Sequence, residues 1–199
     1  LERAWSHIFR AWTVLYTGLS VRARLEYAIF LVAVFLIYWG LFRLGGLRIG
    51  FLIVASYVFY AASNPWFLSL LVASTLTDYF VGLGMHRATI EGAKRRKKLL
   101  LVISLAMNLG LLATFKYANF FYESFVDVGN SLGGDLTFTK LDIFLPAGIS
   151  FYTFQTMSYT IDLYRGRCAP ERNLGRFALF VGFFPQLVAG PIVRAVDFL

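Results

Sequence analysis

Residues 94–118 read KRRKKLLLVISLAMNLGLLATFKYA, five basic residues followed by twenty that are mostly apolar. About 20 consecutive apolar residues are enough for a helix to cross the hydrocarbon core of a bilayer. A basic run beside such a segment is typical of a cytoplasmic loop. We therefore predict a transmembrane helix over residues 99–118, preceded by a cytoplasmic joint over residues 85–98.

The rest of the chain repeats this pattern. Of its 199 residues 58% are hydrophobic and only 15% are charged, which is more apolar surface than one soluble core can bury. Joints rich in glycine, proline or charge, such as residues 44–48 and Asn64-Pro65, separate the apolar stretches. The further predicted spans are residues 27–42, 51–62, 66–83, 143–164 and 177–193. The sequence thus predicts an all-α protein that crosses the membrane several times.

The charges of the joints alternate in sign. Residues 119–142 contain four acidic residues against one lysine, whereas residues 165–176 contain four arginines against one glutamate. Lysine and arginine are enriched in cytoplasmic loops. We therefore predict that residues 119–142 lie outside and that residues 165–176 lie in the cytoplasm, on the same side as residues 85–98.

The opening of the chain differs from the spans. Trp5 and Phe9 fall on one helical face and Arg10 on the other, as in an amphipathic helix that lies in the membrane interface. We predict such an interfacial helix over residues 1–25 and a transmembrane helical domain over residues 26–199.

Two stretches near the C-terminal end contain helix-breaking residues. Residues 143–164 include Pro146, and residues 177–193 include Pro185 and the Gly190-Pro191 pair. Lipid cannot satisfy the backbone groups that a broken helix frees, so such a helix must face protein or water. We therefore predict interrupted helices in this part of the chain.

Some spans also contain ionisable residues. Asp162 and Arg165 are three residues apart on one helix, so we expect them to form an ion pair, either as a structural brace or beside a substrate passage. For Asp78 we expect snorkelling to the interface or capping by a neighbouring helix. The stem of Lys116 is long enough to reach the lipid headgroups.

The residues offer little for catalysis. His7 and His86 lie where water reaches them, so neither is predicted to act as a general base. Cys168 is the single cysteine, and no metal-ligand cluster is evident.

The net charge of +8 comes mainly from the joints, so we do not predict nucleic-acid binding. The run at residues 94–98 sets topology, or attracts anionic lipid or an acidic carrier protein.

Two long segments resemble a known family. Residues 145–166, LPAGISFYTFQTMSYTIDLYRG, and residues 177–194, FALFVGFFPQLVAGPIVR, are similar to hallmark segments of membrane-bound O-acyltransferases. The likeness is to the bacterial branch that contains alginate O-acetyltransferases and teichoic-acid D-alanyl transferases. Shorter segments at residues 55–61, 78–85 and 115–121 resemble the same family in the same order.

The resemblance implies a multi-pass protein of the bacterial inner membrane. Proteins of this family transfer an acyl group from acyl-CoA or an acyl carrier protein to a hydroxyl acceptor outside, and no permanently bound cofactor is expected. The partners implied are membrane lipid, an extracytoplasmic acyl-handling protein, and a polysaccharide or cell-wall polymer. The family's essential histidine lies downstream of the matching segments. The chain is therefore expected to be the N-terminal part of such an enzyme, inactive alone, with no catalytic residue of its own.

The resemblance also suggests residues that line or brace the acyl passage. These are Gln155, Tyr159, Asp162, Tyr164, Arg165, Gln186 and Arg194. Two other functions remain open from sequence. Interrupted helices with polar groups at membrane depth are also typical of transporters or channel subunits, and a non-catalytic membrane scaffold would show the same apolar pattern.

Overall fold

The computed structural model describes residues 21–41, 45–63, 65–134, 137, 148–189 and 193–198. Helices make up almost all of these residues, and no strand occurs among them. Three helical segments are long and apolar enough to cross a membrane: Gly45–Ala62, Pro65–Ile90 and Lys94–Ser131. The prediction of an all-α membrane protein is confirmed.

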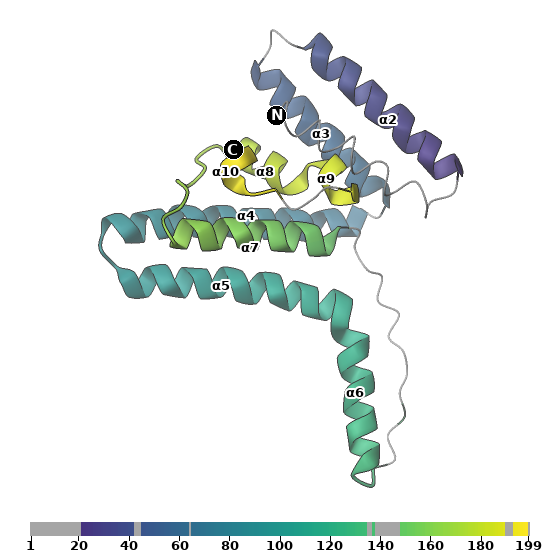
Figure 1. The fold of residues 1–199 in the computed structure, drawn as a ribbon, viewed down its shortest axis with the longest axis vertical. Coiled ribbons are helices and arrows are strands. Elements are labelled where there is room, and N and C mark those ends of the chain that lie inside the picture. The colour runs from purple at the N-terminus through teal and green to yellow at the C-terminus, as the bar shows by residue number, and fades with distance from the viewer. Residues whose placement is uncertain are drawn as a thin grey trace.

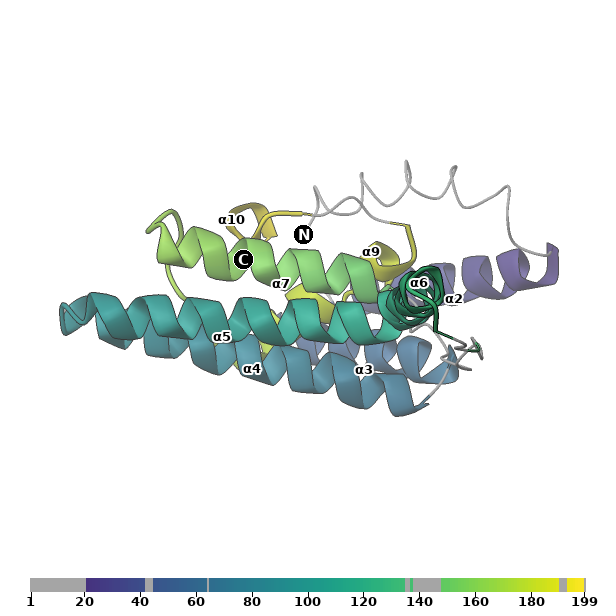
Figure 2. The same ribbon diagram turned by 90° about the horizontal axis from the view of Figure 1, so that it is seen from below.

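Three helices form the centre of the fold. Figures 1 and 2 show α4, α5 and α7 side by side, and α3 packs against α4 as well as against α8 and α9. The helices are α2 (Val21–Gly40), α3 (Gly45–Ser63), α4 (Pro65–Ile90), α5 (Lys94–Leu112), the π-helix η1 (Ala113–Tyr117), α6 (Ala118–Ser131), α7 (Ile149–Tyr164), α8 (Leu174–Gly182), α9 (Phe184–Ala189) and α10 (Ala195–Phe198).

The helices extend further than the hydropathy pattern predicts. Residues 85–98 were expected to form a joint, but α4 continues to Ile90 and α5 begins at Lys94. Only a short turn separates them, and Gly92 there has a φ of +67°. Residues 45–48, also a predicted joint, form the first turn of α3. Lysine and arginine are good helix formers, so a helix can continue beyond its apolar part.

The start of the chain remains a prediction. Residues 1–20 of the predicted interfacial helix lie outside the described residues, and α2 begins at Val21. The Asn64-Pro65 signal agrees with the structure, because α4 begins at Pro65. The first position of a helix suits proline, since its backbone nitrogen needs no partner there.

The interruption predicted within residues 177–193 is present. Helix α8 ends at Gly182, and Phe183 is extended, with φ −62° and ψ 109°, before α9 begins. The other predicted breaks, at Pro146 and Gly190-Pro191, lie outside the described residues. Helix α7 itself is continuous.

Aromatic rings hold the interrupted segment in place. The ring centroid of Phe184 lies 5.1 Å from that of Phe30 on α2 and 5.3 Å from that of Phe59 on α3. On the other side, Phe177 lies 4.9 Å from Tyr159 of α7. Ring pairs at these separations contribute about 0.5–1.5 kcal/mol each beyond the area that they bury. The break between α8 and α9 is therefore fixed between two aromatic clusters.

Candidate functional site

A buried cluster of polar side chains lies where α4, α5 and α7 meet. Each helix supplies two residues that are four positions apart, so that both lie on one face. We call this set the polar cluster. Its members are Ser74 and Asp78, Ser104 and Asn108, and Thr156 and Thr160, each no more than 1% exposed.

Asp78 accepts hydrogen bonds from α5. Ser104 Oγ lies 2.5 Å from Asp78 Oδ1, and Asn108 Nδ2 lies 2.8 Å from Asp78 Oδ2. Among the described basic residues none forms an ion pair with this carboxyl group. Of the two roles predicted for Asp78, snorkelling is wrong, because the side chain is fully buried. The expected capping by a neighbouring helix takes the form of side-chain hydrogen bonds from within α5.

Asn108 joins all three helices. Its Nδ2 donates to Asp78, while its Oδ1 accepts from Ser74 Oγ at 3.0 Å and from Thr156 Oγ1 at 3.2 Å. One amide therefore connects α4 to α7 through α5. We did not select Asn108 from the sequence. The signal was its four-residue spacing from Ser104 within an apolar span, repeated by similar pairs on α4 and α7.

The two predicted glutamines are brought together at the break between α8 and α9. Gln155 Nε2 donates to the carbonyl oxygen of Phe180 at 2.7 Å and lies 3.2 Å from Gln186 Oε1. On the other side of the break, the backbone nitrogen of Phe184 donates to Ser56 Oγ at 3.3 Å. Side chains of α7 and α3 thus satisfy backbone groups that a continuous helix would pair internally.

The predicted pair of Asp162 and Arg165 is wrong. The partner of Asp162 is Arg167, whose Nη1 lies 3.6 Å from Oδ1. The reason is that α7 ends at Tyr164, and Gly166, with a φ of +72°, turns the chain back. This turn also allows the backbone nitrogen of Arg167 to donate to the carbonyl oxygen of Asp162 at 2.9 Å. Arg165 is exposed.

Two tyrosines fix the loop that follows α7. The hydroxyl of Tyr159 is buried and accepts from the backbone nitrogen of Glu171 at 3.2 Å. Tyr79 of α4 donates to the carbonyl oxygen of Arg172 at 2.7 Å. The close fit requires Gly82, because a Cβ there would lie 2.9 Å from the Tyr159 hydroxyl. This loop is therefore part of the packed structure.

The remaining predicted residues do not join either polar group. The ring of Tyr164 lies under Lys97, with Nζ 5.4 Å from its centroid. Arg194 is exposed. Lys116 Nζ, on η1 before α6, lies 3.4 Å from Ser150 Oγ in the first turn of α7.

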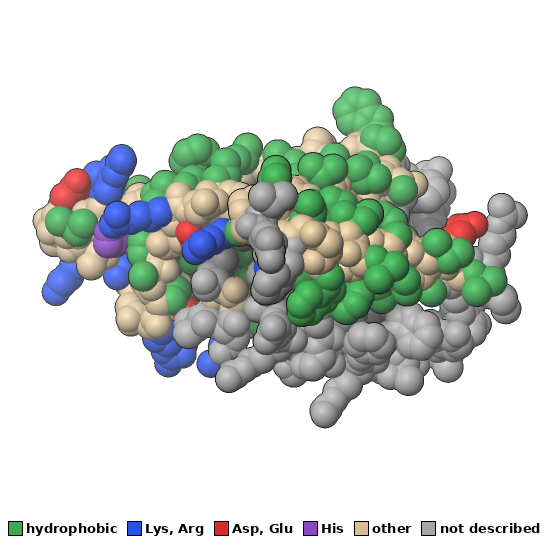
Figure 3. Space-filling view, turned by 90° about the horizontal axis from the view of Figure 1, so that it is seen from above, with side chains coloured by type: hydrophobic (Ala, Val, Ile, Leu, Met, Phe, Trp, Pro, Cys, Tyr) green, Lys and Arg blue, Asp and Glu red, His purple; other side chains and the backbone are tan. Residues whose placement is uncertain are grey.

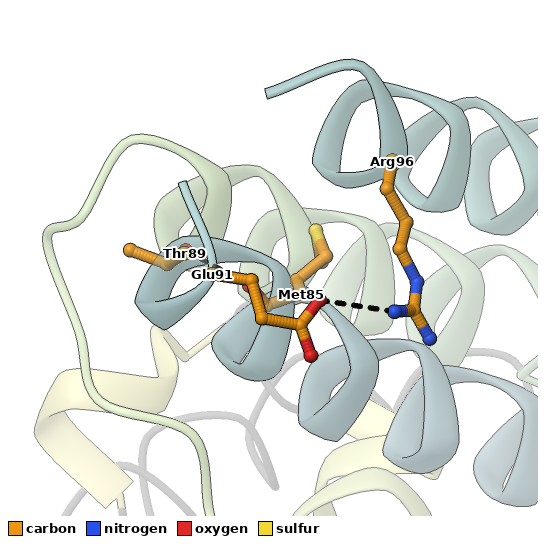
Figure 4. Close-up of polar contacts among 4 residues, drawn as sticks. All are labelled: Met85, Thr89, Glu91 and Arg96. Carbon is orange, nitrogen blue, oxygen red and sulfur yellow. Dashed lines mark hydrogen bonds and ion pairs between the residues drawn. The ribbon is translucent and has the colours of Figure 1, made fainter. Parts of the chain in front are cut away.

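Basic side chains gather at one end of the molecule, as Figure 3 shows. Both predicted cytoplasmic segments, residues 85–98 and 165–176, contribute to this end. Arg96 is paired there with Glu91 at 3.1 Å across the turn between α4 and α5, beside Thr89 (Figure 4). Both side chains are more than half exposed, so this ion pair contributes at most about 1 kcal/mol.

The described residues include no catalytic constellation that we recognise. No group of three His, Cys, Asp or Glu residues among them could hold a metal ion. His86 lies on α4 within the basic end, and His7 lies outside the described residues. Burial, and then the nearby charge of Asp162, raises the pKa of the Cys168 thiol. The polar cluster and the paired glutamines connect neighbouring helices through hydrogen bonds.

Comparisons with known proteins agree with the resemblance seen in the sequence. No family model and no solved structure matches the chain. It is 41% identical over 171 residues to a probable alginate O-acetylase AlgI of Pseudomonas putida, covering 85% of the chain and 35% of that protein. The protein of the same name from Pseudomonas aeruginosa is 40% identical over 171 residues, covering 85% of the chain and 32% of that protein.

A peptidoglycan O-acetyltransferase of Helicobacter pylori is 35% identical over 167 residues, covering 72% of the chain and 30% of that protein. The chain thus spans about a third of the length of the curated relatives that it matches. These findings confirm the resemblance to membrane-bound O-acyltransferases, and the chain is a relative of the bacterial alginate O-acetylases over most of its length.

Proposed function

We propose that this chain is the part of a membrane-bound O-acetyltransferase that braces the passage between an acyl donor in the cytoplasm and a polymer outside. The observation that carries the proposal is the 41% identity to an alginate O-acetylase over 85% of the chain. The acceptor is then a hydroxyl group of an exopolysaccharide or cell-wall polymer. The membrane is the bacterial inner membrane, and a further extracytoplasmic protein handles the acyl group.

The charge distribution supports the cytoplasmic position of the donor. The basic end of the bundle combines residues 85–98 with residues 165–176 (Figure 3). Acyl-CoA contains phosphate groups, and acyl carrier proteins are acidic, so a cationic surface favours the approach of either donor. The donor is substrate in this proposal, and no resident cofactor is part of it.

The polar contacts hold the helices and the loop beside the passage in fixed positions. Gln155 and Gln186 hold the break between α8 and α9, and the polar cluster fixes α7 against α4 and α5. Tyr159 and Asp162 position the loop after α7, and Arg165 and Arg194 remain exposed and available to a ligand or to other parts of the protein. We propose that the general base that accepts the acceptor's proton is not in this chain.

A transporter would also use an interrupted helix. In known transport folds the backbone groups at such a break point toward the substrate or ion. Here Ser56 accepts from the backbone nitrogen of Phe184, and Gln155 donates to the carbonyl oxygen of Phe180. Because these groups are already occupied by side chains, the geometry favours a structural break over a transport site.

The experiment is acetyl transfer by the full-length protein. It is assayed in permeabilised cells that lack their native copy but retain the extracytoplasmic protein that handles the acyl group. The cells are supplied with radiolabelled acetyl-CoA and de-acetylated alginate, and the full-length protein is compared with its residues 1–199 alone and with a His86→Ala variant. We expect alkali-labile label on the polymer from the full-length protein and from His86→Ala, and none from residues 1–199. Loss of transfer on changing His86 would contradict the proposed place of the base. Absence of transfer to alginate and to peptidoglycan, with either acyl-CoA or acyl carrier protein as donor, would contradict the function.

A further inference from the structure

Helix α6 leaves the bundle at the end opposite the basic loops. Figures 1 and 2 show it running crosswise to α4, α5 and α7, which lie side by side. The change of direction occurs at Tyr117, the last residue of the π-helix η1, where φ is −117° and ψ is 0°. Irregular helical turns of this kind are a usual cause of sharp bends. Helix α6 is therefore a separate element and not a continuation of the span.

The preceding span is complete before α6 begins. The 19 residues from the end of the basic run to the end of η1, residues 99–117, rise about 28 Å at roughly 1.5 Å per residue. This length is close to the hydrocarbon core of a bilayer, which is about 30 Å thick. Lys116, with an exposed ammonium group 3.4 Å from Ser150 Oγ, marks the level at which the span reaches the headgroups. Helix α6 thus starts at that level and runs across it.

The two faces of α6 differ in chemistry. Phe121, Phe125 and Val128 follow one another at spacings of four and three residues, so they share one face. They are 60%, 70% and 58% exposed, which is unusual for large apolar side chains in contact with water. Glu123 and Asp127, four residues apart, lie on the other face and are exposed too.

We propose that α6 is an interfacial helix that lies flat in the extracytoplasmic surface of the bilayer. Its apolar face, Phe121, Phe125 and Val128, lies among the upper parts of the lipid acyl chains, while Glu123 and Asp127 face water. The level at which α6 starts and its crosswise direction place the exposed apolar face beside lipid. An amphipathic helix with aromatic side chains on its apolar face binds such a surface. The proposal does not depend on acetyl transfer.

Fluorescence quenching in the full-length protein tests this position. In a background that lacks Cys168 and every other native cysteine, an environment-sensitive fluorophore is attached after Phe125→Cys, after Val128→Cys, or after Ala106→Cys on the exposed face of α5. The protein is reconstituted in vesicles that contain lipids spin-labelled at a shallow or at a deep acyl position. We expect stronger quenching by the shallow label at 125 and 128, and by the deep label at 106.

A second measurement examines the polar face. After Asp127→Cys we expect rapid reaction with an impermeant maleimide in spheroplasts, and much slower reaction after Phe125→Cys. Equal rates at both positions would mean that α6 lies in water. Protection at 125 without quenching by either lipid would mean that protein covers this face, and deeper quenching at 125 than at 106 would mean that α6 crosses the membrane. Each of these results would overturn the proposal.

Discussion

Replacing Asn108 with leucine tests whether the polar cluster holds the three central helices together. Leucine has the same number of non-hydrogen side-chain atoms as asparagine and the same branch point, although it is bulkier, so the change removes the hydrogen bonds and keeps the branched shape. Asp78 Oδ2 loses the donor at 2.8 Å, and the hydroxyls of Ser74 and Thr156 lose their shared acceptor. Three buried groups are then without these partners at membrane depth.

The expected loss of stability follows from the number of contacts. Hydrogen bonds between membrane helices contribute about 0.6 kcal/mol each on average and at most about 1.7 kcal/mol. A buried polar group that is left without a partner costs more, about 1–3 kcal/mol. We therefore expect Asn108→Leu to reduce the free energy of unfolding by about 2–4 kcal/mol.

The assay is reversible unfolding of the full-length protein in mixed micelles, followed by circular dichroism. Thr114→Val is the matched control, because its hydroxyl bonds only to the carbonyl oxygen of Gly110 on its own helix and is exposed. We expect it to lose less than about 1 kcal/mol. The combined change of Asp78→Leu and Asn108→Leu should cost less than the two single losses added together, since the residues interact directly. Additive losses, or a loss at Asn108 no larger than at Thr114, would refute the reasoning.

Three further results are expected. Arg167→Gln reduces the free energy of unfolding by less than about 1 kcal/mol, seen as a slightly lower melting temperature, whereas Arg165→Gln leaves the melting temperature unchanged. An equal effect of both changes would contradict the ion pair between Asp162 and Arg167. Gly148→Ala costs about 1–3 kcal/mol, because φ is +71° and the new Cβ would lie 3.0 Å from a carbonyl oxygen, whereas Gly46→Ala meets nothing within 4 Å and is tolerated. Burial raises the pKa of Cys168, so its alkylation at pH 8 is slower than that of a free cysteine and increases as pH rises; a rate that levels off below pH 8 would contradict this.

Local sequence patterns predicted the three helices that are able to cross a membrane, as spans over residues 51–62, 66–83 and 99–118. Hydropathy depends on neighbouring residues alone, so the apolar stretches and the interruption near Pro185 were evident before the structure. Spacing along the chain could not predict that Gln155 lies close to Gln186, because 31 positions separate them. Both lie in segments that resemble the same family, and that resemblance placed them in one candidate site.

The errors came from contacts that depend on how the chain turns. Asp162 was assigned to Arg165 by helical spacing, but the helix ends at Tyr164 and Gly166 brings Arg167 back to the carboxyl group. Spacing predicts a partner only where the helix continues. The role of Asp78 was left open for a related reason, since its donors lie 26 and 30 positions away on another helix.

The polar residues of α7 explain why this segment is so unlike a lipid-facing span. Thr156 and Thr160 face the polar cluster, whereas Gln155 faces the break between α8 and α9. Apolar side chains pack against lipid about as well as against another helix, so they determine little about how a buried helix is rotated. Hydrogen bonds on two different faces allow one rotation only, because a shift by one residue, about 100°, would separate both sets from their partners. The polar content of α7 thus fixes its orientation in the bundle, and with it the position of the loop that Tyr159 and Asp162 hold at the basic end.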